Sequence, residues 1–257
     1  MAFTHNNFAE LLTKYNYNIQ VGDIIAGIIF SEEKQGYLVD IGISTAAYLP
    51  KEEISIRIKK QESLEINLAQ EFFILAQNIQ TNNIIVSTKR LLYIRGWARI
   101  RQLSKEDIIV QAKVTGINKG GLLVELENIQ GFIPKSHLCY ITNIDKILNS
   151  TISCKCLIAE EQSNKLILSN RAAILEQYIS KLKVGTILTS KIVEIKSYGA
   201  FVSIYNIPAL LHISETETEI DKTNNFFIGQ TIPVQIIHVD VQQGRLSVSR
   251  RCFLKLK

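Results

Sequence analysis

Apolar and polar residues alternate with a period of two over many short segments of this chain. Residues 200–204 read Ala-Phe-Val-Ser-Ile, and residues 245–249 read Arg-Leu-Ser-Val-Ser. This alternation is typical of a strand with one buried and one exposed face, whereas an amphipathic helix repeats about every 3.6 residues. Roughly one residue in six is Ile, which favours strands. The pattern therefore predicts a mainly β protein.

The same arrangement of strands occurs three times along the chain. Each copy has a glycine before its second strand, where a tight turn or bulge needs a residue without Cβ: Gly36, Gly120 and Gly199. Alignment of the copies on positions 23, 107 and 186 places them 84 and 79 residues apart (from 23 to 107 and from 107 to 186). Each copy is therefore a small domain of about 70 residues followed by a connector.

Each copy has five short strands, with a longer polar stretch between the third and the fourth. The third strands are expected at 46–50, 131–134 and 209–212, the fourth at 72–78, 152–160 and 231–239, and the fifth at 84–87, 166–169 and 246–249. Five strands in this order match the OB fold. We therefore expect three tandem five-stranded OB-fold barrels.

The connectors between the copies change to helical periodicity. Residues 87–103 and 169–182 predict short amphipathic helices, and residues 8–15 predict another one ahead of the first barrel. The expected organisation is an N-terminal helix and docking segment at 1–19, a first repeat at 20–90, a linker helix at 91–104, a second repeat at 105–171, a linker helix at 172–183, a third repeat at 184–251 and a C-terminal tail at 252–257.

Several motifs resemble a known family. Gly199-Ala200-Phe201, Leu211-His212-Ile213-Ser214 and residues 244–249 resemble the S1 RNA-binding motif. Trp97 in a basic linker, Lys119-Gly120-Gly121-Leu122 and the run from Gly131 to Ser136 are similar to the ribosomal S1 family, in its three-repeat cyanobacterial and plastid form. The resemblance covers nearly the whole chain. It implies a protein of the small ribosomal subunit that binds single-stranded mRNA and helps load it for translation initiation. It also implies docking on ribosomal RNA and ribosomal proteins through the N-terminal helix and first repeat.

The third repeat carries the strongest candidates for RNA contact. Single-stranded RNA is bound by stacking bases on aromatic rings beside basic groups. Tyr198 and Phe201 flank the Gly199 turn, and His212 has the opposite parity to Leu211 and should face outward. Lys191 and Arg245 are expected on adjacent strands, where they can meet phosphates. The alternatives are that Phe201 is a core residue and that His212 is a hydrogen-bonded structural histidine.

The first two repeats depart from this pattern. In place of Tyr198, Phe201 and His212, the second repeat is expected to have Lys119, Leu122 and Pro134, and the first to have Gln35, Leu38 and Pro50. Phe132 and Tyr48 share the outward parity of His212, so each can offer one stacking platform, although Phe132 can equally be buried against the following helix. Further basic residues of the second repeat that can add charge are Lys113, Lys119, Lys135 and Arg171. We therefore expect the third repeat to bind RNA most strongly.

Charge and cysteine spacing add little to this picture. A net charge of +5 suits a polyanionic partner but does not prove one. The basic linker can contact rRNA or simply be a solvated helix face; its cations are Lys89, Arg90, Arg95, Arg99, Arg101 and Lys105. The spacing of Cys139, Cys154, Cys156 and Cys252 does not fit a zinc site, so we expect free thiols and neither metal nor cofactor.

The sequence has no catalytic constellation, Walker loop or dinucleotide fingerprint, so we expect neither an enzyme nor a small-molecule substrate. No apolar run reaches the roughly 18 to 20 residues of a membrane span, and no targeting segment is recognisable. The resemblance to the three-repeat cyanobacterial and plastid form, together with a bias towards Ile, Asn and Lys, implies a plastid-encoded protein of the stroma, with the bacterial cytoplasm as the alternative. Rival functions are an accessory protein of RNA processing, degradation or transcription, and a protein-interaction scaffold.

Overall fold

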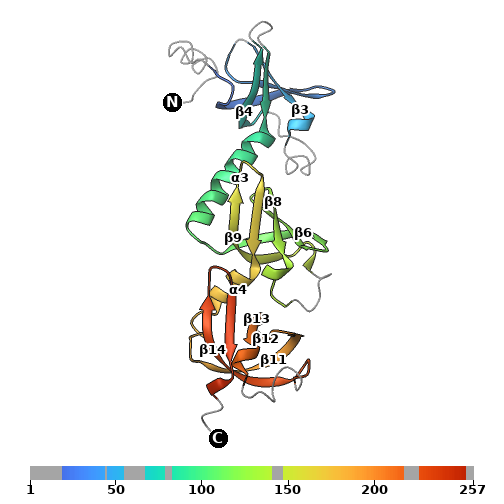
Figure 1. The fold of residues 1–257 in the computed structure, drawn as a ribbon. Coiled ribbons are helices and arrows are strands. Elements are labelled where there is room, and N and C mark those ends of the chain that lie inside the picture. The colour runs from blue at the N-terminus through green and yellow to red at the C-terminus, as the bar shows by residue number, and fades with distance from the viewer. Residues whose placement is uncertain are drawn as a thin grey trace. The chain divides into compact units, whose positions relative to one another are not determined.

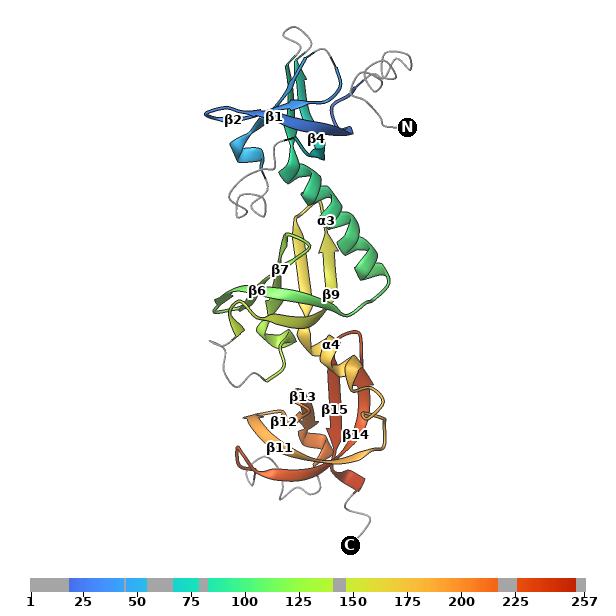
Figure 2. The same ribbon diagram turned by 180° about the vertical axis from the view of Figure 1, so that it is seen from behind.

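The computed structural model describes residues 19–43, 45–54, 67–78, 83–140, 147–216 and 226–252. These residues form three closed five-stranded barrels, so the predicted fold is confirmed (Figures 1 and 2). The chain divides into two compact units, residues 1–98 and residues 99–257, and the second unit contains the second and third barrels. The helix predicted for residues 8–15 lies outside the described residues.

The first barrel has the strand order β1-β2-β3-β5-β4. Its strands are β1 (Ile24–Glu32), β2 (Gly36–Asp40), β3 (Ala47–Pro50), β4 (Ala69–Asn78) and β5 (Asn83–Ser87), and the 3-10 helix η1 (Lys51–Glu53) follows β3. Val39, Leu49, Phe72 and Ile74 are fully buried inside the barrel. Alternate residues point outward, as the period of two requires.

The second barrel repeats this topology. It consists of β6 (Val110–Asn118), β7 (Gly121–Leu126), β8 (Ile129–Pro134), the 3-10 helix η2 (Lys135–His137), β9 (Thr151–Glu160) and β10 (Lys165–Ser169). β10 lies between β8 and β9, and it pairs parallel with β8. β9 in turn pairs with β6, the first strand of the barrel. The parallel pairing of β10 with β8 therefore closes the sheet into a barrel.

The third barrel is built in the same way, in the order β11-β12-β13-β15-β14. Its elements are β11 (Ile187–Lys196), β12 (Gly199–Ile204), β13 (Ile207–His212), the 3-10 helix η4 (Ile213–Glu215), β14 (Thr231–Asp240) and β15 (Arg245–Ser249). Its core includes Val202, Leu211, Val234 and Val248, all fully buried.

Two helices connect the barrels. α3 (Thr88–Lys105) follows the first barrel, and it buries Leu91, Trp97, Ile100 and Leu103. α4 (Asn170–Gln177) begins where the Ser169 hydroxyl accepts a hydrogen bond of 3.1 Å from the Ala172 amide.

α4 is shorter than the helix predicted to reach residue 183. Tyr178 leaves the helical conformation, with ψ of 7°, and the chain continues in turns. Leu182 is nevertheless buried in the core of the third barrel. The apolar spacing therefore marked a buried residue correctly, although a turn and not a helix places it there.

Several contacts join the second and third barrels within their common unit. Leu175 of α4 lies in the core of the third barrel. Lys155 of β9, almost completely buried, forms ion pairs of 2.7 Å with Glu176 of α4 and 2.5 Å with Asp107. The rings of Tyr178 and Tyr205 stack with centroids 4.6 Å apart. α4 is thus held by both barrels, which restricts their relative movement.

Candidate nucleic-acid interface

The outward face of β12 and β13 gathers the aromatic candidates of the third barrel. Ala200, Val202 and Ile204 point inward and are buried, so Phe201 between them points outward and is half-buried. Its cross-strand neighbours are Leu210 on β13 and Glu194 on β11. Phe201 is therefore a surface residue at the centre of this face, and the alternative of a core position is wrong.

Tyr198 stands beside Phe201 at the start of β12. Their rings meet edge to face, with centroids 6.3 Å apart and planes at 88°. The exposed fraction of Tyr198 is 46%. Gly199 between them lies opposite His212, and a Cβ at this glycine would collide with the carbonyl oxygen of Leu211. The close approach that only glycine permits therefore brings Tyr198 and His212 to the same end of the face.

The His212 side chain stabilises the start of η4 and is also exposed to solvent. Its Nδ1 accepts a hydrogen bond of 3.2 Å from the Ser214 amide, at the start of η4, and lies 2.8 Å from the Ser214 hydroxyl. The neutral ring that accepts at Nδ1 carries its proton on Nε2. Because the side chain is exposed, Nε2 can donate to an RNA oxygen while Nδ1 holds the turn.

Lys191 and Arg245 do not lie on adjacent strands, which corrects the prediction. β11 pairs with β12 and β14, whereas β15 pairs with β13 and β14. Lys191 is paired with Ser203 of β12. In the closed barrel, β12 and β13 separate β11 from β15 on one side, and β14 separates them on the other. The two exposed cations consequently flank the aromatic face from opposite sides. The prediction failed because strand order in a closed barrel depends on non-local pairing.

The register of the second barrel also differs from the sequence alignment. Gly121 faces Pro134, the last residue of β8, just as Gly199 faces His212, so Gly121 and not Gly120 is the equivalent glycine. The counterpart of Phe201 is then Leu123, which is 42% exposed, rather than Leu122, which is 2% exposed. The counterpart of Tyr198 becomes Gly120 instead of Lys119. A shift of one residue exchanges the inner and outer faces of a strand.

With this register, the three barrels share one outward cross-strand pair. The pair is Leu38 and Tyr48 in the first barrel, Leu123 and Phe132 in the second, and Phe201 and Leu210 in the third. Each barrel therefore presents one aromatic ring and one aliphatic side chain at this place, with the two strands exchanged in the third barrel. Sequence comparison missed this relationship, because it compared equivalent positions and not neighbouring strands.

In each of the first two barrels the aromatic ring lies over a glycine near the start of the second strand: Gly36 in the first barrel and Gly120, the residue before Gly121, in the second. A Cβ on Gly36 would come within 2.6 Å of the Tyr48 ring, and one on Gly120 within 3.4 Å of the Phe132 ring. Phe132 is half-buried, and its ring covers Gly120. Its outer surface is therefore available to a ligand.

Lys113, Lys119 and Lys135 are exposed around the second barrel. In α3, part of the positive charge is paired within the protein. Arg95 forms an ion pair with Glu71, Arg101 lies 2.9 Å from Glu161, and the Arg90 guanidinium lies 5.0 Å from the centroid of the Tyr93 ring. The two ion pairs reduce the charge that the linker can offer to rRNA, and the contact with Tyr93 holds Arg90 against the helix.

The cysteines are free thiols, and burial raises the pKa of Cys139 and Cys154 to about 12. Such thiols remain protonated at neutral pH and react slowly. In the described ranges, no three His, Cys, Asp or Glu side chains are grouped to hold a metal ion. Neither α3 nor α4, the helices of the described chain, is long and apolar enough to cross a membrane.

Each of the three OB-type barrels presents an outward aromatic ring, and the second and third barrels also carry exposed lysine or arginine side chains. These features place this chain in the class of multi-barrel RNA-binding proteins. A family model described as S1 RNA binding domain matches residues 104–170 and 181–251, which contain the second and third barrels. The chain belongs to the small ribosomal subunit protein bS1 family.

Its relatives cover nearly the whole chain. Identity is 47% to small ribosomal subunit protein bS1c of Pyropia yezoensis, over 97% of this chain and 96% of the relative. Identity is 40% to small ribosomal subunit protein bS1A of Synechocystis, over 98% of this chain and 78% of the relative. Identity is 33% to small ribosomal subunit protein bS1c of Spinacia oleracea, over 98% of this chain and 62% of the relative. The relatives thus include plastid-type proteins of a red alga and spinach as well as a cyanobacterial protein.

Proposed function

We propose that the protein binds single-stranded mRNA on the small ribosomal subunit and helps load it for translation initiation. The observation that carries this proposal is the outward face of the third barrel, where Tyr198, Phe201 and His212 lie between the flanking cations Lys191 and Arg245. Bases stack on aromatic rings whatever their identity, each contributing about 1 to 3 kcal/mol, and cations meet the phosphates. Such a face holds mRNA without selecting one sequence.

The second barrel contributes a weaker part of the same surface. Phe132 is its stacking platform, while Lys119 and Lys135 supply charge at the end of the barrel near the turn glycine. The third barrel has two aromatic rings and a histidine where the second has one ring, so it dominates the affinity. Linked weak sites add avidity because the second contact is intramolecular.

The relatives are named as small ribosomal subunit proteins, which supports docking on rRNA and ribosomal proteins. We assign this docking to residues 1–19 and the first barrel. The red algal and spinach relatives, with the bias towards Ile, Asn and Lys, favour the plastid stroma over the bacterial cytoplasm. The protein acts by binding, without catalysis, cofactor or small-molecule substrate.

The test is a titration of fluorescent oligo(U) with the full chain, followed by anisotropy. The double variant Tyr198→Ala/Phe201→Ala is expected to weaken binding at least about tenfold, because two stacking surfaces are lost. The matched control Tyr198→Phe/Phe201→Tyr keeps both rings and is expected to bind within about twofold of the wild type. Equal affinity of the alanine variant and the wild type would refute RNA binding on this face.

A further inference from the structure

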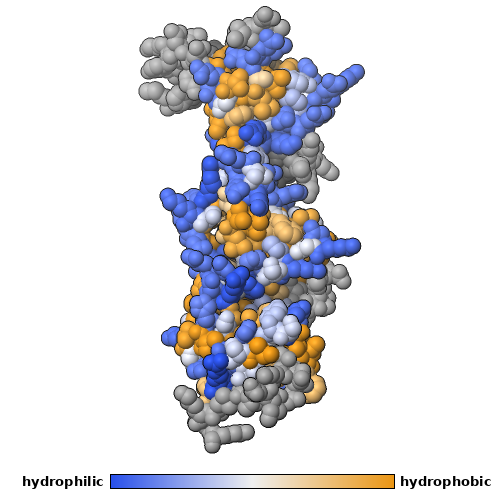
Figure 3. Space-filling model, viewed as in Figure 1, coloured by the Kyte–Doolittle hydropathy of each residue, from blue (hydrophilic) through white to orange (hydrophobic). Residues whose placement is uncertain are grey.

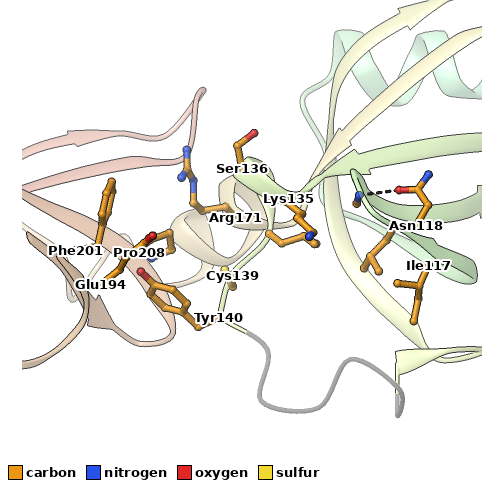
Figure 4. Close-up of a pocket in the computed structure, with 13 residues that line it drawn as sticks. Ile117, Asn118, Lys135, Ser136, Cys139, Tyr140, Arg171, Glu194, Phe201 and Pro208 are labelled. Carbon is orange, nitrogen blue, oxygen red and sulfur yellow. Dashed lines mark hydrogen bonds between the residues drawn. The ribbon is translucent and has the colours of Figure 1, made fainter. Parts of the chain in front are cut away.

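A pocket of about 430 Å³ opens between the second and third barrels of the second unit (Figure 4). Phe201 and Pro208 of the third barrel form part of its wall. Leu138 and Tyr140, from the segment after η2, and Lys135 of η2 itself form another part, and Arg171 of α4 completes it. Since Phe201 also stands at the centre of the aromatic face, the pocket continues that face towards the second barrel.

The pocket is held by contacts on both sides. The Tyr140 amide donates a hydrogen bond of 2.9 Å to the Asn206 carbonyl, which fastens the segment after η2 to the third barrel. A Cβ on Gly244 would lie 2.8 Å from the Ala172 amide nitrogen, so the β14–β15 turn packs closely on α4. The walls are therefore positioned before any ligand arrives, and a preorganised site loses less entropy on binding.

The pocket lining contains one carboxylate, Glu194, and two cations, Lys135 and Arg171. Arg171 is the cation that lies on α4. Its Nη2 donates to the Gln243 carbonyl at 3.3 Å, while its buried Nε has no hydrogen-bond partner among the described residues. Burial lowers the pKa of Arg171, and repulsion from nearby Arg245 lowers it further, although the guanidinium stays charged at neutral pH. Two neighbouring cations, with no carboxylate of the described residues in ion-pair distance of Arg171, favour an anion such as a phosphate.

The rest of the lining suits a nucleobase. Phe201, Pro208 and Leu138 offer apolar surfaces, and its volume is within the range of roughly 300 to 1,000 Å³ for small-molecule sites. Burial, together with nearby Glu194, raises the pKa of Tyr140, so its phenol keeps its proton and can donate a hydrogen bond. Figure 4 shows Arg171 extending from α4 towards the space between the barrels, with Phe201 and Lys135 on different sides.

We propose that this pocket binds one nucleotide of single-stranded RNA, with its base against Phe201 and Tyr140 and its phosphate on Arg171. The strand then passes Lys135 and continues over the face of the second barrel that carries Phe132. The second and third barrels accordingly form one continuous RNA site and not two independent ones. This inference rests on the proposed function, because it assigns a further subsite to the same RNA surface.

The test compares two lengths of fluorescent oligo(U) on the full chain: about 5 nucleotides, which one barrel can hold, and about 15, which can span both. Arg171→Gln is expected to weaken the binding of the long strand about tenfold and to leave the short strand within about twofold. Arg171→Lys, which keeps the charge, is expected to retain most of the affinity. Unchanged melting temperatures show that the variants keep the fold.

Other outcomes separate this inference from the proposed function. If Arg171→Gln binds both strands like the wild type while Tyr198→Ala/Phe201→Ala weakens both, the pocket subsite is refuted and the function stands. If Arg171→Gln weakens both lengths equally, the residue belongs to a single-barrel site and the continuous site is refuted. If the double alanine variant also binds normally, the proposed function fails.

A second measurement needs no substitution. Oligo(U) of about 15 nucleotides with 4-thiouridine is irradiated on the wild-type chain, and cross-linked peptides are identified by mass spectrometry. Adducts are expected at Tyr140 as well as at Tyr198. Adducts at Tyr198 with none in residues 135–140 would overturn the pocket subsite.

Discussion

Leu123 of β7 and Phe132 of β8 are direct cross-strand neighbours on the outside of the second barrel, and the third barrel has the same pair with the residue types exchanged, Phe201 of β12 and Leu210 of β13. The exchange preserves one aromatic and one aliphatic side chain at the same place on the sheet. A ring on either strand can present its face to a base, because neighbouring outward residues share one surface. The second barrel is thus equipped for RNA contact although it lacks the motif aromatics of the third.

Phe132→Leu is expected to weaken the binding of long oligo(U) by the full chain about three- to tenfold, since one stacking surface is lost. The effect should be smaller than that of Phe201→Leu, because the third barrel keeps the dominant face. Anisotropy titrations measure both constants, and Phe132→Tyr serves as the control that keeps the ring. Wild-type affinity of Phe132→Leu would show that its ring is purely structural.

Exchanging Phe201 and Leu210 tests whether the ring can act from either strand. Phe201→Leu alone is expected to weaken binding about fivefold or more, and the addition of Leu210→Phe should restore at least part of the loss. Both positions are half-buried and face outward, so the exchange conserves volume on the surface. A double-mutant cycle on oligo(U) affinity measures the coupling. A double variant as weak as the single one would mean that the ring must stand on β12.

Lys191→Ala and Arg245→Ala are each expected to weaken oligo(U) binding and to lower the slope of log affinity against log salt by about 0.7, the value for one phosphate contact on a single strand. Because the two cations flank the face from opposite sides, their effects should add. Lys183→Ala, an exposed lysine before β11, is the control and should leave the slope unchanged. Slopes equal to that of the wild type would exclude these phosphate contacts.

Lys155→Met tests the link between the second barrel and α4. It removes a buried ammonium that bonds to Asp107 and Glu176, and it is expected to lower the free energy of unfolding by about 1 to 3 kcal/mol. The loss stays below that of a fully buried pair because both carboxylates retain contact with water. Denaturant unfolding of the full chain measures the difference, and Lys165→Met, at an exposed lysine, is the control.

The same lysine predicts a pH dependence. Burial alone would lower the pKa of Lys155, but hydrogen bonds and attraction from Asp107 and Glu176 outweigh it and raise the pKa. Its stabilising contribution is therefore fully present below the pKa of a free lysine, about 10.4, and is lost as pH rises through the higher folded value. The wild type should lose more stability than Lys155→Met in that alkaline range. Parallel curves for the two proteins would contradict this assignment.

Removal of residues 1–18 is expected to reduce co-sedimentation with small ribosomal subunits while oligo(U) affinity stays within about twofold. The reason is that the proposed docking segment and the RNA face occupy different parts of the chain. Tyr198→Ala/Phe201→Ala should behave in the opposite way. Normal co-sedimentation of the shortened chain would move the docking surface elsewhere.

The sequence alone determined the three barrels and much of the third barrel's face. Its period of two correctly predicted that Leu211 is buried and that His212 points outward. Successive side chains of a strand alternate between its two faces, whichever strands lie beside it. The glycine before the second strand located Tyr198 and Phe201 by the same local rule. These properties depend on residues close in sequence, so they can be derived without tertiary contacts.

Contacts between residues distant in sequence determine which side chains are neighbours across strands. The structure places Lys191 and Arg245 on strands that are not adjacent. It also shows that Leu123, and not Leu122, lies on the outer face of the second barrel, where Leu123 is paired with Phe132. It also placed Arg171 and Phe201 around one pocket. Register, barrel closure and the packing of α4 all arise from contacts between distant residues, and the alternation of residues within one strand does not encode them.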